Sequence, residues 1–356
     1  MDNILKSKKY DAILVAGEGK NSYKVSHQHK AFLRVEGQSM VSYVLRALQQ
    51  VDSIQNIYVV GPKIQLMRHL AEDRIDLQAP KTITILEQRE NLFENVWHTF
   101  LLTLPEPIAA DQLETSPYRN RAVLVVPCDA PLITPHEIEY FIQNCDMENH
   151  DHVLGLTPET ALRPFYPGPG QPGIKMAYLH LKENIYRINN LHLVKPLQMK
   201  NRHYIQQMYQ YRYQRNLINV GRFALKLIGK DKRNRFGYYL GLLLGLMFSR
   251  LKLDGLVDFF RSWVPKKGLE ECISNIMQTR FVGLEVPFPG AALDVDNSKD
   301  YETLKLRFQE WRNTLRQLET QHPLPHGTVR TLARKKPAPK VAANLSFSKV
   351  DGSATG

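Results

Sequence analysis

The sequence predicts an α/β protein whose mostly parallel sheet lies between two layers of helices. Short apolar runs alternate with segments of helical periodicity in the N-terminal part of the chain, which is the pattern of a parallel sheet with crossover helices. The 356 residues are 43% hydrophobic and 23% charged, so the chain is globular and long enough for one large domain with additions or for two domains.

The elements of this sheet follow from the spacing of apolar residues. The runs DAILVAG and NIYVVG each predict a buried strand, and the segment between them spaces apolar side chains three and four residues apart, as a helix requires. Further strands are predicted at residues 82–86 and at RAVLVVP, with a helix between them at about residues 91–104. Another helix begins near Thr134, because Pro135 suits its first turn and Glu137 follows at the position of a capping box.

The second half of the chain is less regular. The turn-rich sequence GPGQPG precedes two alternating runs, KMAYLHL and NNLHLV, which predict strands joined by a hairpin-like connection. Residues 196–264 are predicted to be helical, residues 281–287 to return as a strand, and residues 297–319 to form a terminal amphipathic helix. The predicted organisation is a core from residues 1–195 and 281–320, a basic and apolar helical insertion at 196–280, and a disordered basic tail at 321–356.

Charge and cysteine content exclude several classes of protein. The formal charge of +12 is concentrated in residues 195–235, which carry +10, and residues 321–356, which carry +5, so the remaining residues carry −3. We therefore expect no nucleic-acid partner for the core. Cys128, Cys145 and Cys272 are too few and too far apart for a disulfide framework or a zinc cluster. With no signal-peptide pattern at the N-terminus, the sequence predicts a cytoplasmic protein.

The loop after the first strand carries the first functional signal. Its two glycines, in VAGEG, would let the backbone approach a ligand closely, most often a phosphate. The P-loop pattern fails, because Ser22 and Tyr23 stand where it needs glycine and lysine. A dinucleotide fingerprint also fails, because residues 20–29 lack the apolar spacing of the helix that should follow. What remains is a long loop of backbone amides and basic side chains that ends at Lys30.

Several motifs resemble those of the MobA-like family of nucleotidyltransferases, a family that includes the molybdenum-cofactor guanylyltransferases. They are VAGEG and KAFL with GQSM near the N-terminus, LEQRENLFENVWHTFLLTL, PCDAPLIT in a mid-chain strand, and ALDVDNSKDYETL before the last helix. The resemblance covers about residues 10–195 and 281–315. It implies a GT-A-like fold with a helical insertion. It also implies an enzyme that transfers NMP from an NTP to a phosphorylated small-molecule acceptor and releases pyrophosphate.

The resemblance also implies roles for particular residues. The nucleotide would be bound by the opening loop and the helix after the third strand, at Val15, Ala16, Gly17, Gly19, Lys20, Lys30 and Asn95. Asp129, which follows a predicted strand, and Asp296 would hold Mg²⁺. Lys30 and Asp129 would be the catalytic pair, since Lys30 would neutralise phosphate charge.

The acceptor would be bound by the strand INNLHLV, at Asn189 and Asn190. This strand departs from the family, because Ile188 and Asn189 replace small glycines. The opening loop departs as well, because Glu18 stands where a second glycine is usual and the loop has no arginine.

Each of these residues also has a purely structural interpretation. Three acidic residues could cap helices, namely Asp129, Asp294 and Asp296. Three polar residues could simply be solvated or packed, namely Lys30, Asn95 and Asn190. We interpret His27 and His29 as solvated loop residues, because no third metal ligand lies near them in the sequence. Cys128 is interpreted as a small packing residue, because no base accompanies it.

The insertion has two interpretations. Gly237, Gly241 and Gly245 are four residues apart in the apolar run FGYYLGLLLGLMF, so one face of a helix would be bare backbone able to pack closely. The run is too short to span a bilayer, which favours a buried helix. With the basic arm before it and LVDFFRSWV after it, residues 196–265 could instead lie on the inner face of a membrane. That arrangement would suit an acceptor that is a lipid precursor.

Two other functions stay open. A GT-A-type glycosyltransferase that uses a nucleotide sugar would need DxD at the end of a mid-chain strand, whereas CDAP has one aspartate there and DVD comes much later. A non-catalytic nucleotide-binding, membrane-associated protein would account for Glu18, Ile188 and Asn189. The released product, pyrophosphate or NDP, distinguishes the two enzymes.

Overall fold

The computed structural model describes residues 8–17, 25, 28–174, 176–201, 236–251 and 253–324. The predictions for Glu18, Gly19, Lys20 and His27, for most of the basic arm, and for the tail beyond residue 324 lie outside the described residues.

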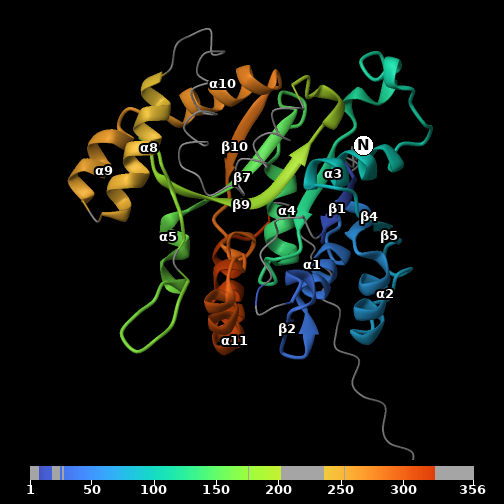
Figure 1. The fold of residues 1–356 in the computed structure, drawn as a ribbon, viewed down its shortest axis with the longest axis horizontal. Coiled ribbons are helices and arrows are strands. Elements are labelled where there is room, and N and C mark those ends of the chain that lie inside the picture. The colour runs from blue at the N-terminus through green and yellow to red at the C-terminus, as the bar shows by residue number, and fades with distance from the viewer. Residues whose placement is uncertain are drawn as a thin grey trace, which may run out of the picture.

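A mixed sheet forms the centre of the molecule (Figure 1). Its strands are β1 (Tyr10–Val15), β4 (Ile54–Gly61), β5 (Ile83–Glu87), β6 (Val123–Pro127), β7 (His152–Pro158), β8 (Leu179–His180), β9 (Ile185–Val194) and β10 (Phe281–Glu285). Among the described residues their order is β10-β7-β9-β6-β1-β4-β5, with β8 paired to β9. β9 is antiparallel to β6, β7 and β8, whereas the other neighbours are parallel. The predicted α/β class with a mostly parallel sheet is confirmed.

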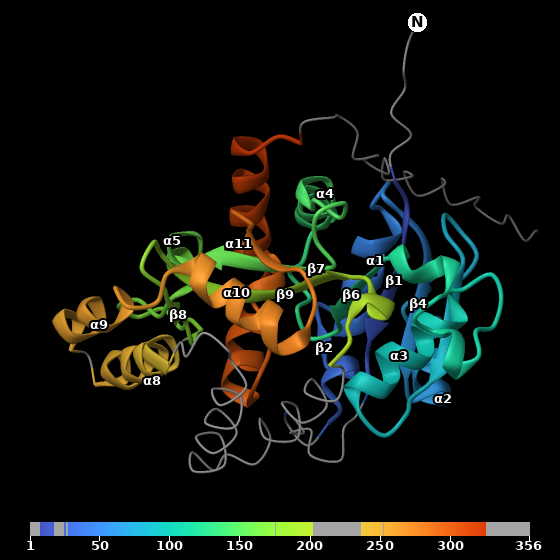
Figure 2. The ribbon, with the colours of Figure 1, turned by 90° about the horizontal axis from the view of Figure 1, so that it is seen from above.

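Helices cover both faces of the sheet. On one face lie α1 (Met40–Gln49), α2 (Lys63–Glu72) and α4 (Pro135–Asn144), and on the other α3 (Leu92–Leu102), α8 (Phe236–Arg250) and α10 (Lys266–Met277). Figure 2 shows α4 on one side of the sheet and α3 and α10 on the opposite side. β1 serves both layers, because Leu14 packs in the cluster with α1 and Val15 in the cluster with α3, as the alternation of a strand requires.

The remaining elements lie at the ends of the sheet. They are α5 (Glu159–Leu162), α9 (Asp254–Arg261), α11 (Ser298–Gln321), a small hairpin of β2 (Arg34–Val35) and β3 (Gln38–Ser39), and six 3₁₀ turns among the described residues, including η1 (Lys30–Phe32) and η6 (Gly290–Ala292). Phe308 and Trp311 of α11 pack against Leu33, Leu132 and Val295, so this helix holds together the segments on either side of the sheet end.

The predicted helices begin where their capping residues indicate. The Asn91 side chain accepts a hydrogen bond from the Glu94 amide at 2.9 Å at the start of α3. Thr134 likewise accepts from the Glu137 amide at 3.1 Å at the start of α4. The sequence did not predict β7 or α2, and α10 was covered only by the predicted helical insertion at residues 196–280. β7 was missed because Gly155 interrupts a short apolar run and weakens the strand pattern.

The two ends of the predicted insertion meet at one buried carboxylate. Asp151 is 5% exposed, and its carboxylate accepts hydrogen bonds from Lys195 Nζ at 3.2 Å and from Arg280 Nε at 2.8 Å. The Lys195 amide also donates to the Asp151 carbonyl at 2.7 Å. Residues 195 and 280 therefore lie side by side. We propose on this basis that residues 196–280 are an insertion into one core.

A histidine pair makes the stability of this sheet dependent on pH. His152 Nε2 and His192 Nδ1 lie 3.2 Å apart on β7 and β9. Burial lowers the pKa of His152 to about 3, helped by His192, and burial lowers the pKa of His192 to about 4. Both histidines are therefore neutral in the folded protein at pH 7, whereas the unfolded chain binds protons at these positions below about pH 6.5.

We expect the free energy of unfolding to fall as the pH is lowered from 7 to 5, by about 2 kcal/mol for the pair after allowance for the partial exposure of the rings. Urea denaturation at several pH values measures it. A His192→Asn variant should lose roughly half of this pH dependence. A stability that stays constant or rises on acidification would contradict the assignment.

Candidate active site

The ends of β1 and β6 meet where the order of the sheet reverses. From β1 the chain crosses to β4 and β5 on one side and then returns to β6 on the other side of β1. The Cys128 amide donates to the Val15 carbonyl at 3.0 Å, so the two strand ends stay paired. Ligands of open α/β sheets bind at such reversal points, outside the carboxyl ends of the strands.

Three carboxylates converge at this point. The Val295 amide donates to the Asp129 carbonyl at 2.9 Å, so residues 294–296 lie next to the end of β6. As a result one carboxylate oxygen from each of Asp129, Asp294 and Asp296 lies within 4.8 Å of the others. Carboxylate oxygens are the hard ligands that Mg²⁺ prefers, and one or two of them beside a substrate phosphate are its usual protein ligands. The donor set therefore fits Mg²⁺.

Lys30 lies between two of these carboxylates. Its Nζ is 3.1 Å from Asp296 Oδ1 and 3.5 Å from Asp129 Oδ2. The turn that presents Lys30 begins at His29, whose Nδ1 accepts a hydrogen bond from the Ala31 amide at 3.1 Å. His29 was expected to be a solvated loop residue, and the structure corrects this: it caps the Lys30 turn and packs against the Phe32 ring at 4.9 Å.

The protonation of this cluster follows from burial and mutual charge. Burial alone would lower the pKa of Lys30, but Asp129 and Asp296 outweigh it and hold that pKa above its usual value. Burial and then the Asp294 charge raise the pKa of Asp129 to about 6, against the opposing effect of Lys30. At pH 7 Lys30 is therefore charged and the Asp129 carboxylate is mostly ionised.

The structural interpretations of the acidic residues do not hold. Thr134 caps α4, so Asp129 does not. The side chain that caps α11 belongs to Asn297 and accepts from the Asp300 amide at 3.0 Å, so neither Asp294 nor Asp296 has that role. Cys128 is 6% exposed in the apolar core, and burial followed by the Asp129 charge raises the pKa of its thiol, in keeping with a packing role.

Arg187 holds the third carboxylate, a role that the sequence did not reveal. Its Nη2 lies 2.5 Å from Asp294 Oδ1, and its Nε donates to the Ala292 carbonyl at 2.9 Å. No motif marks this arginine in the sequence. Asp294 was expected there only as a possible helix cap and not as a ligand of the same site.

Glu137 was expected only in a capping box, yet it also fixes the turn that precedes Asp294. This residue is fully buried, and its carboxylate accepts from the Ala291 amide at 2.9 Å. A Cβ at Gly290 would lie 2.5 Å from Glu137 Oε2, so the turn can approach this closely because residue 290 is glycine. The hydrogen bond from the Ala291 amide to Glu137 of α4 thus fixes the position of the turn that precedes Asp294.

The residues predicted to bind nucleotide divide into two groups. Val15 and Ala16 are buried, and the Ala16 amide donates to the Val60 carbonyl at 2.8 Å. The sheet therefore uses this amide, and the predicted contact of Val15 and Ala16 with a nucleotide stays a prediction. Gly17 and Asn95 do lie together: a Cβ at Gly17 would be 2.8 Å from Asn95 Nδ2. Asn95 Oδ1 in turn accepts from the Arg89 amide at 2.5 Å.

The predicted acceptor residues point in different directions. Asn189 is fully buried against Gly155, where a Cβ would lie 1.9 Å from its Oδ1, so its predicted contact with an acceptor stays a prediction. Asn190 is partly exposed with a left-handed φ of 63°, and its Nδ2 donates to the Ala291 carbonyl at 3.1 Å. Asn190 therefore contacts the turn that carries Asp294.

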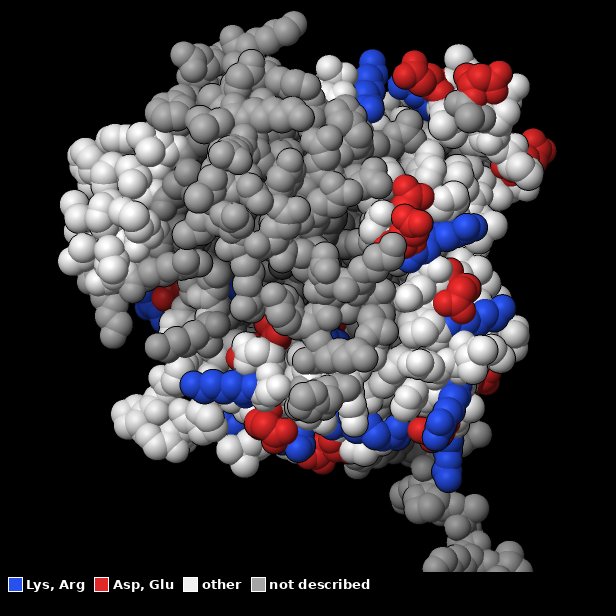
Figure 3. All heavy atoms as spheres, in the orientation of Figure 1, with Lys and Arg blue, Asp and Glu red and all other residues white. Residues whose placement is uncertain are grey.

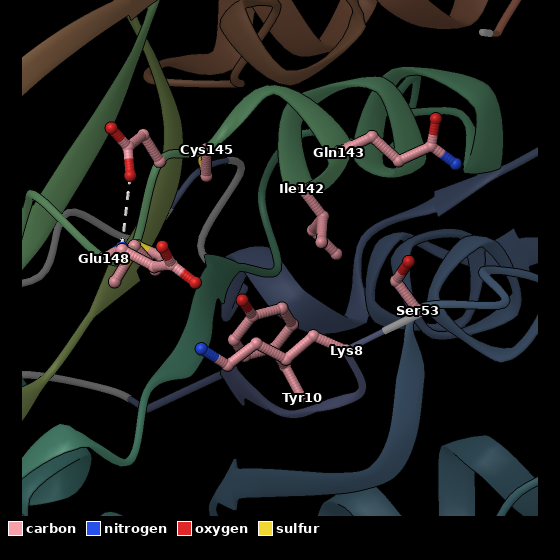
Figure 4. Close-up of a pocket in the computed structure, with 9 residues that line it drawn as sticks. Lys8, Tyr10, Ser53, Ile142, Gln143, Cys145 and Glu148 are labelled. Carbon is pink, nitrogen blue, oxygen red and sulfur yellow. Dashed lines mark hydrogen bonds between the residues drawn. The ribbon is translucent and has the colours of Figure 1, made fainter. Parts of the chain in front are cut away.

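A cavity of about 310 Å³ lies away from these residues (Figure 4). It is lined by Lys8, Tyr10 and Ser53 together with Ile142, Gln143, Cys145, Asp146, Met147 and Glu148. Tyr10 begins β1, so this cavity lies at the amino end of the strand, opposite the carboxyl end where the carboxylates meet. Its position does not suit the nucleotide of an open α/β sheet.

Comparisons with known proteins agree with this architecture. Residues 12–172 match the family model of the MobA-like NTP transferase domain. A solved structure of a hypothetical transferase from Thermus thermophilus is similar with a TM-score of 0.54 and 19% sequence identity, and the match covers 82% of this chain and 99% of that chain. No curated protein matches the chain.

Two further solved structures match with a TM-score of 0.41, 11% identity, and coverage of 85% of this chain and 99% of theirs. They are a CMP:2-keto-3-deoxy-manno-octonic acid synthetase complexed with CTP and the 4-diphosphocytidyl-2C-methyl-D-erythritol synthase from Anaerococcus prevotii. The family assignment rests on the model match, which includes the Lys30 turn and the Asp129 strand end. Residues 12–172 of this chain are thus similar to the MobA-like NTP transferase domain.

Proposed function

We propose that the chain is a Mg²⁺-dependent nucleotidyltransferase that transfers NMP from an NTP to a phosphorylated small-molecule acceptor and releases pyrophosphate. The observation that carries the proposal is the meeting of Asp129, Asp294 and Asp296 around the Lys30 side chain at the end of β6. These groups come from three distant segments, and none of the three carboxylates is used as a helix cap.

The charge of the cluster favours a divalent cation. The positive charges of Lys30 and Arg187 balance the negative charges of two of the three carboxylates. One formal negative charge is left in a partly buried site. Asp129 and Asp296 would hold Mg²⁺, while Asp294 is oriented by Arg187. The ion would supply neutralisation of charge on the α-phosphate.

Lys30 would bind the phosphates of the nucleotide. Its ammonium stays protonated beside Asp129 and Asp296, and the turn that begins at His29 presents it to the site. An oxygen of the acceptor phosphate would attack the α-phosphorus, and the bond from that phosphorus to the β-phosphate bridging oxygen would break, so pyrophosphate leaves with that oxygen. Positioning and charge neutralisation supply most of the rate enhancement in such a reaction.

The remaining contacts would orient the two substrates. Gly17 leaves room for a nucleotide beside the Asn95 amide, since any side chain at residue 17 would collide with Asn95. Asn190 and Arg187 contact the same turn from β9, which supports an acceptor site on the β9 side of the carboxylates. Gly19 and Lys20, outside the described residues, complete the nucleotide loop in this proposal.

A thermal-shift screen of the four NTPs with and without Mg²⁺ tests the proposal. A ligand that binds the native state raises the melting temperature, and 100 times its Kd stabilises by about 2.7 kcal/mol. We expect one NTP to raise the melting temperature only when Mg²⁺ is present. Absence of any nucleotide-dependent shift would sink the proposal.

Product analysis then separates the two enzyme classes. The stabilising NTP, incubated with Mg²⁺ and a panel of phosphorylated sugars, alcohols and lipid precursors, should release pyrophosphate with at least one acceptor. Release of NDP from a nucleotide sugar, without pyrophosphate from any NTP, would instead make the chain a glycosyltransferase.

A further inference from the structure

Helices α8 and α9 form a lobe at the outer end of the sheet (Figure 1). One side of this lobe packs on the core: Tyr238 and Leu242 join the cluster formed by β7, β8, β9 and β10. A Cβ at Gly241 would lie 2.7 Å from Val264 and 3.0 Å from the Phe260 carbonyl, so the glycine face of α8 is in close contact with the segment that follows it. The predicted close packing of this face is therefore present at Gly241 alone, because a Cβ at Gly237 would have nothing within 4 Å and one at Gly245 would make only an ordinary contact.

The other side of the lobe exposes large apolar side chains. Eleven large apolar residues are strongly exposed in the described part of the chain, and six of them fall within residues 247–263. They are Met247 at 44%, Leu251 at 59%, Leu253 at 45%, Leu256 at 42%, Phe259 at 54% and Trp263 at 38%. Scattered apolar residues are normal on a protein surface, but a contiguous patch of this kind marks an interaction site.

Helix α9 has apolar side chains on its inner side and on its outer side. Val257, Phe260 and Val264 face inward, whereas Leu256, Phe259 and Trp263 recur at the spacing of a second helical face and point outward. A surface helix normally has a polar outer face, whereas the outer face of α9 is mixed, because large apolar side chains are exposed there together with Asp258. In Figure 3 the lobe lies at the left of the view, with its described uncharged residues in white.

The shape and charge of the lobe favour a lipid bilayer as that partner. The rings of Phe259, Phe260 and Trp263 pack edge to face on one another and present a projecting surface, and phenylalanine and tryptophan are suited to the interfacial region of a bilayer. Residues 236–267 carry five Lys and Arg against two acids, and residues 195–235 carry +10. This charge is complementary to anionic lipids.

Two acidic residues lie in the lobe sequence, Asp254 and Asp258, and Arg261 Nε lies 3.5 Å from Asp258 Oδ1. Among the described residues no helix is long and apolar enough to cross a membrane. Contact with a bilayer would therefore be peripheral.

We propose that the α8–α9 lobe docks on the surface of an anionic bilayer, with Leu253, Leu256, Phe259 and Trp263 inserted in the interface. The lobe is connected to the site, because α8 contacts β8, and β8 pairs with the segment of β9 that leads to Arg187. Docking would bring the acceptor side of the sheet next to the membrane. If the nucleotidyltransferase proposal holds, this arrangement points to a phosphorylated acceptor carried by a lipid.

Vesicle flotation of the full chain tests the docking surface. We expect the protein to float with vesicles of phosphatidylcholine and phosphatidylserine, and at least tenfold less with phosphatidylcholine alone at low salt. The double variant Leu256→Ser, Phe259→Ser should lose at least tenfold of the vesicle-bound fraction. Leu306→Ser with Ile64→Ser is the matched control, since both residues are exposed apolar positions elsewhere, at 73% and 84%, and it should float like the unmodified chain.

Stability, activity and oligomeric state distinguish docking on a bilayer from misfolding and from self-association. The Leu256→Ser, Phe259→Ser variant should keep its melting temperature and its pyrophosphate release with a soluble acceptor, because neither residue lies in the site. Equal flotation of this variant and the unmodified chain would overturn the proposal. So would sedimentation showing a dimer that dissociates in this variant, because the patch would then be an interface between two copies of the chain. Flotation does not require catalysis, so it stands or falls separately from the proposed enzyme activity.

Discussion

Asp129→Asn is expected to lower the rate of pyrophosphate release by about 1000-fold or more, because the amide removes a negative charge from the proposed metal site. The isosteric change leaves the backbone contact with Val295 in place, since that bond uses the Asp129 carbonyl. Coupled pyrophosphate detection, with the NTP found in the thermal-shift screen, measures the effect.

The same substitution should not destabilise the protein. Burial and Asp294 raise the pKa of Asp129 to about 6, so the ionised carboxylate is unfavourable in the folded state and an uncharged amide removes that cost. We expect an unchanged or slightly higher melting temperature, together with loss of the Mg²⁺-dependent shift. Asp111→Asn, at an exposed position in a surface turn, is the control for a loss of one negative charge. Wild-type turnover by Asp129→Asn would show that Asp129 has no part in the reaction.

Gly61→Ala is expected to destabilise the fold by about 2–3 kcal/mol, because the added methyl group overpacks the end of the sheet. A Cβ at Gly61 would lie 2.5 Å from the Ala16 carbonyl oxygen and 2.9 Å from its carbon, and backbone atoms cannot move aside as a flexible side chain can. The strain would fall on the residues immediately before the nucleotide loop. We therefore expect weaker nucleotide binding as well as lower stability.

Thermal denaturation should show a decrease in melting temperature of about 5–10 °C for this variant. Gly237→Ala provides the matched control, because a Cβ at this position in α8 has nothing within 4 Å. Gly237 lies in the first turn of α8, where the change to alanine should be neutral or stabilise by up to about 1 kcal/mol. If Gly61→Ala melts at the wild-type temperature, the close approach of β4 to Ala16 is not a constraint.

The sheet could be predicted from the sequence because its strands are short apolar runs separated by clear helical periods. The helix starts at Asn91 and Thr134 could also be predicted, because each capping hydrogen bond joins residues only three positions apart in the sequence. β7 was not readable, because Gly155 breaks its pattern. That glycine exists to accommodate Asn189 from the adjacent strand, which is a tertiary requirement that no local pattern contains.

The residues of the candidate site that belong to local sequence motifs could be predicted, and those without a motif could not. Lys30, Asp129 and Asp296 were identified through motifs, and the structure places them together. Arg187 lies in an ordinary strand sequence and becomes important only because β9 passes beside the Asp294 segment. The burial of Asn189 could not be predicted either, because the β7–β9 register shifts between Leu154 and Leu156, and such an irregularity changes which side chains face each side of a sheet.

Asp151 binds both Lys195 and Arg280, so the two ends of the segment between these residues are held together whatever the length of that segment. The cost of closing a flexible segment grows only slowly with its length, so a connection fastened at its base can be long or short with little effect on the body that carries it. Changes of length or sequence between residues 195 and 280 are thus expected to leave β9 and β10 in place, and with them the contact between Arg187 and Asp294 at the other end of β9.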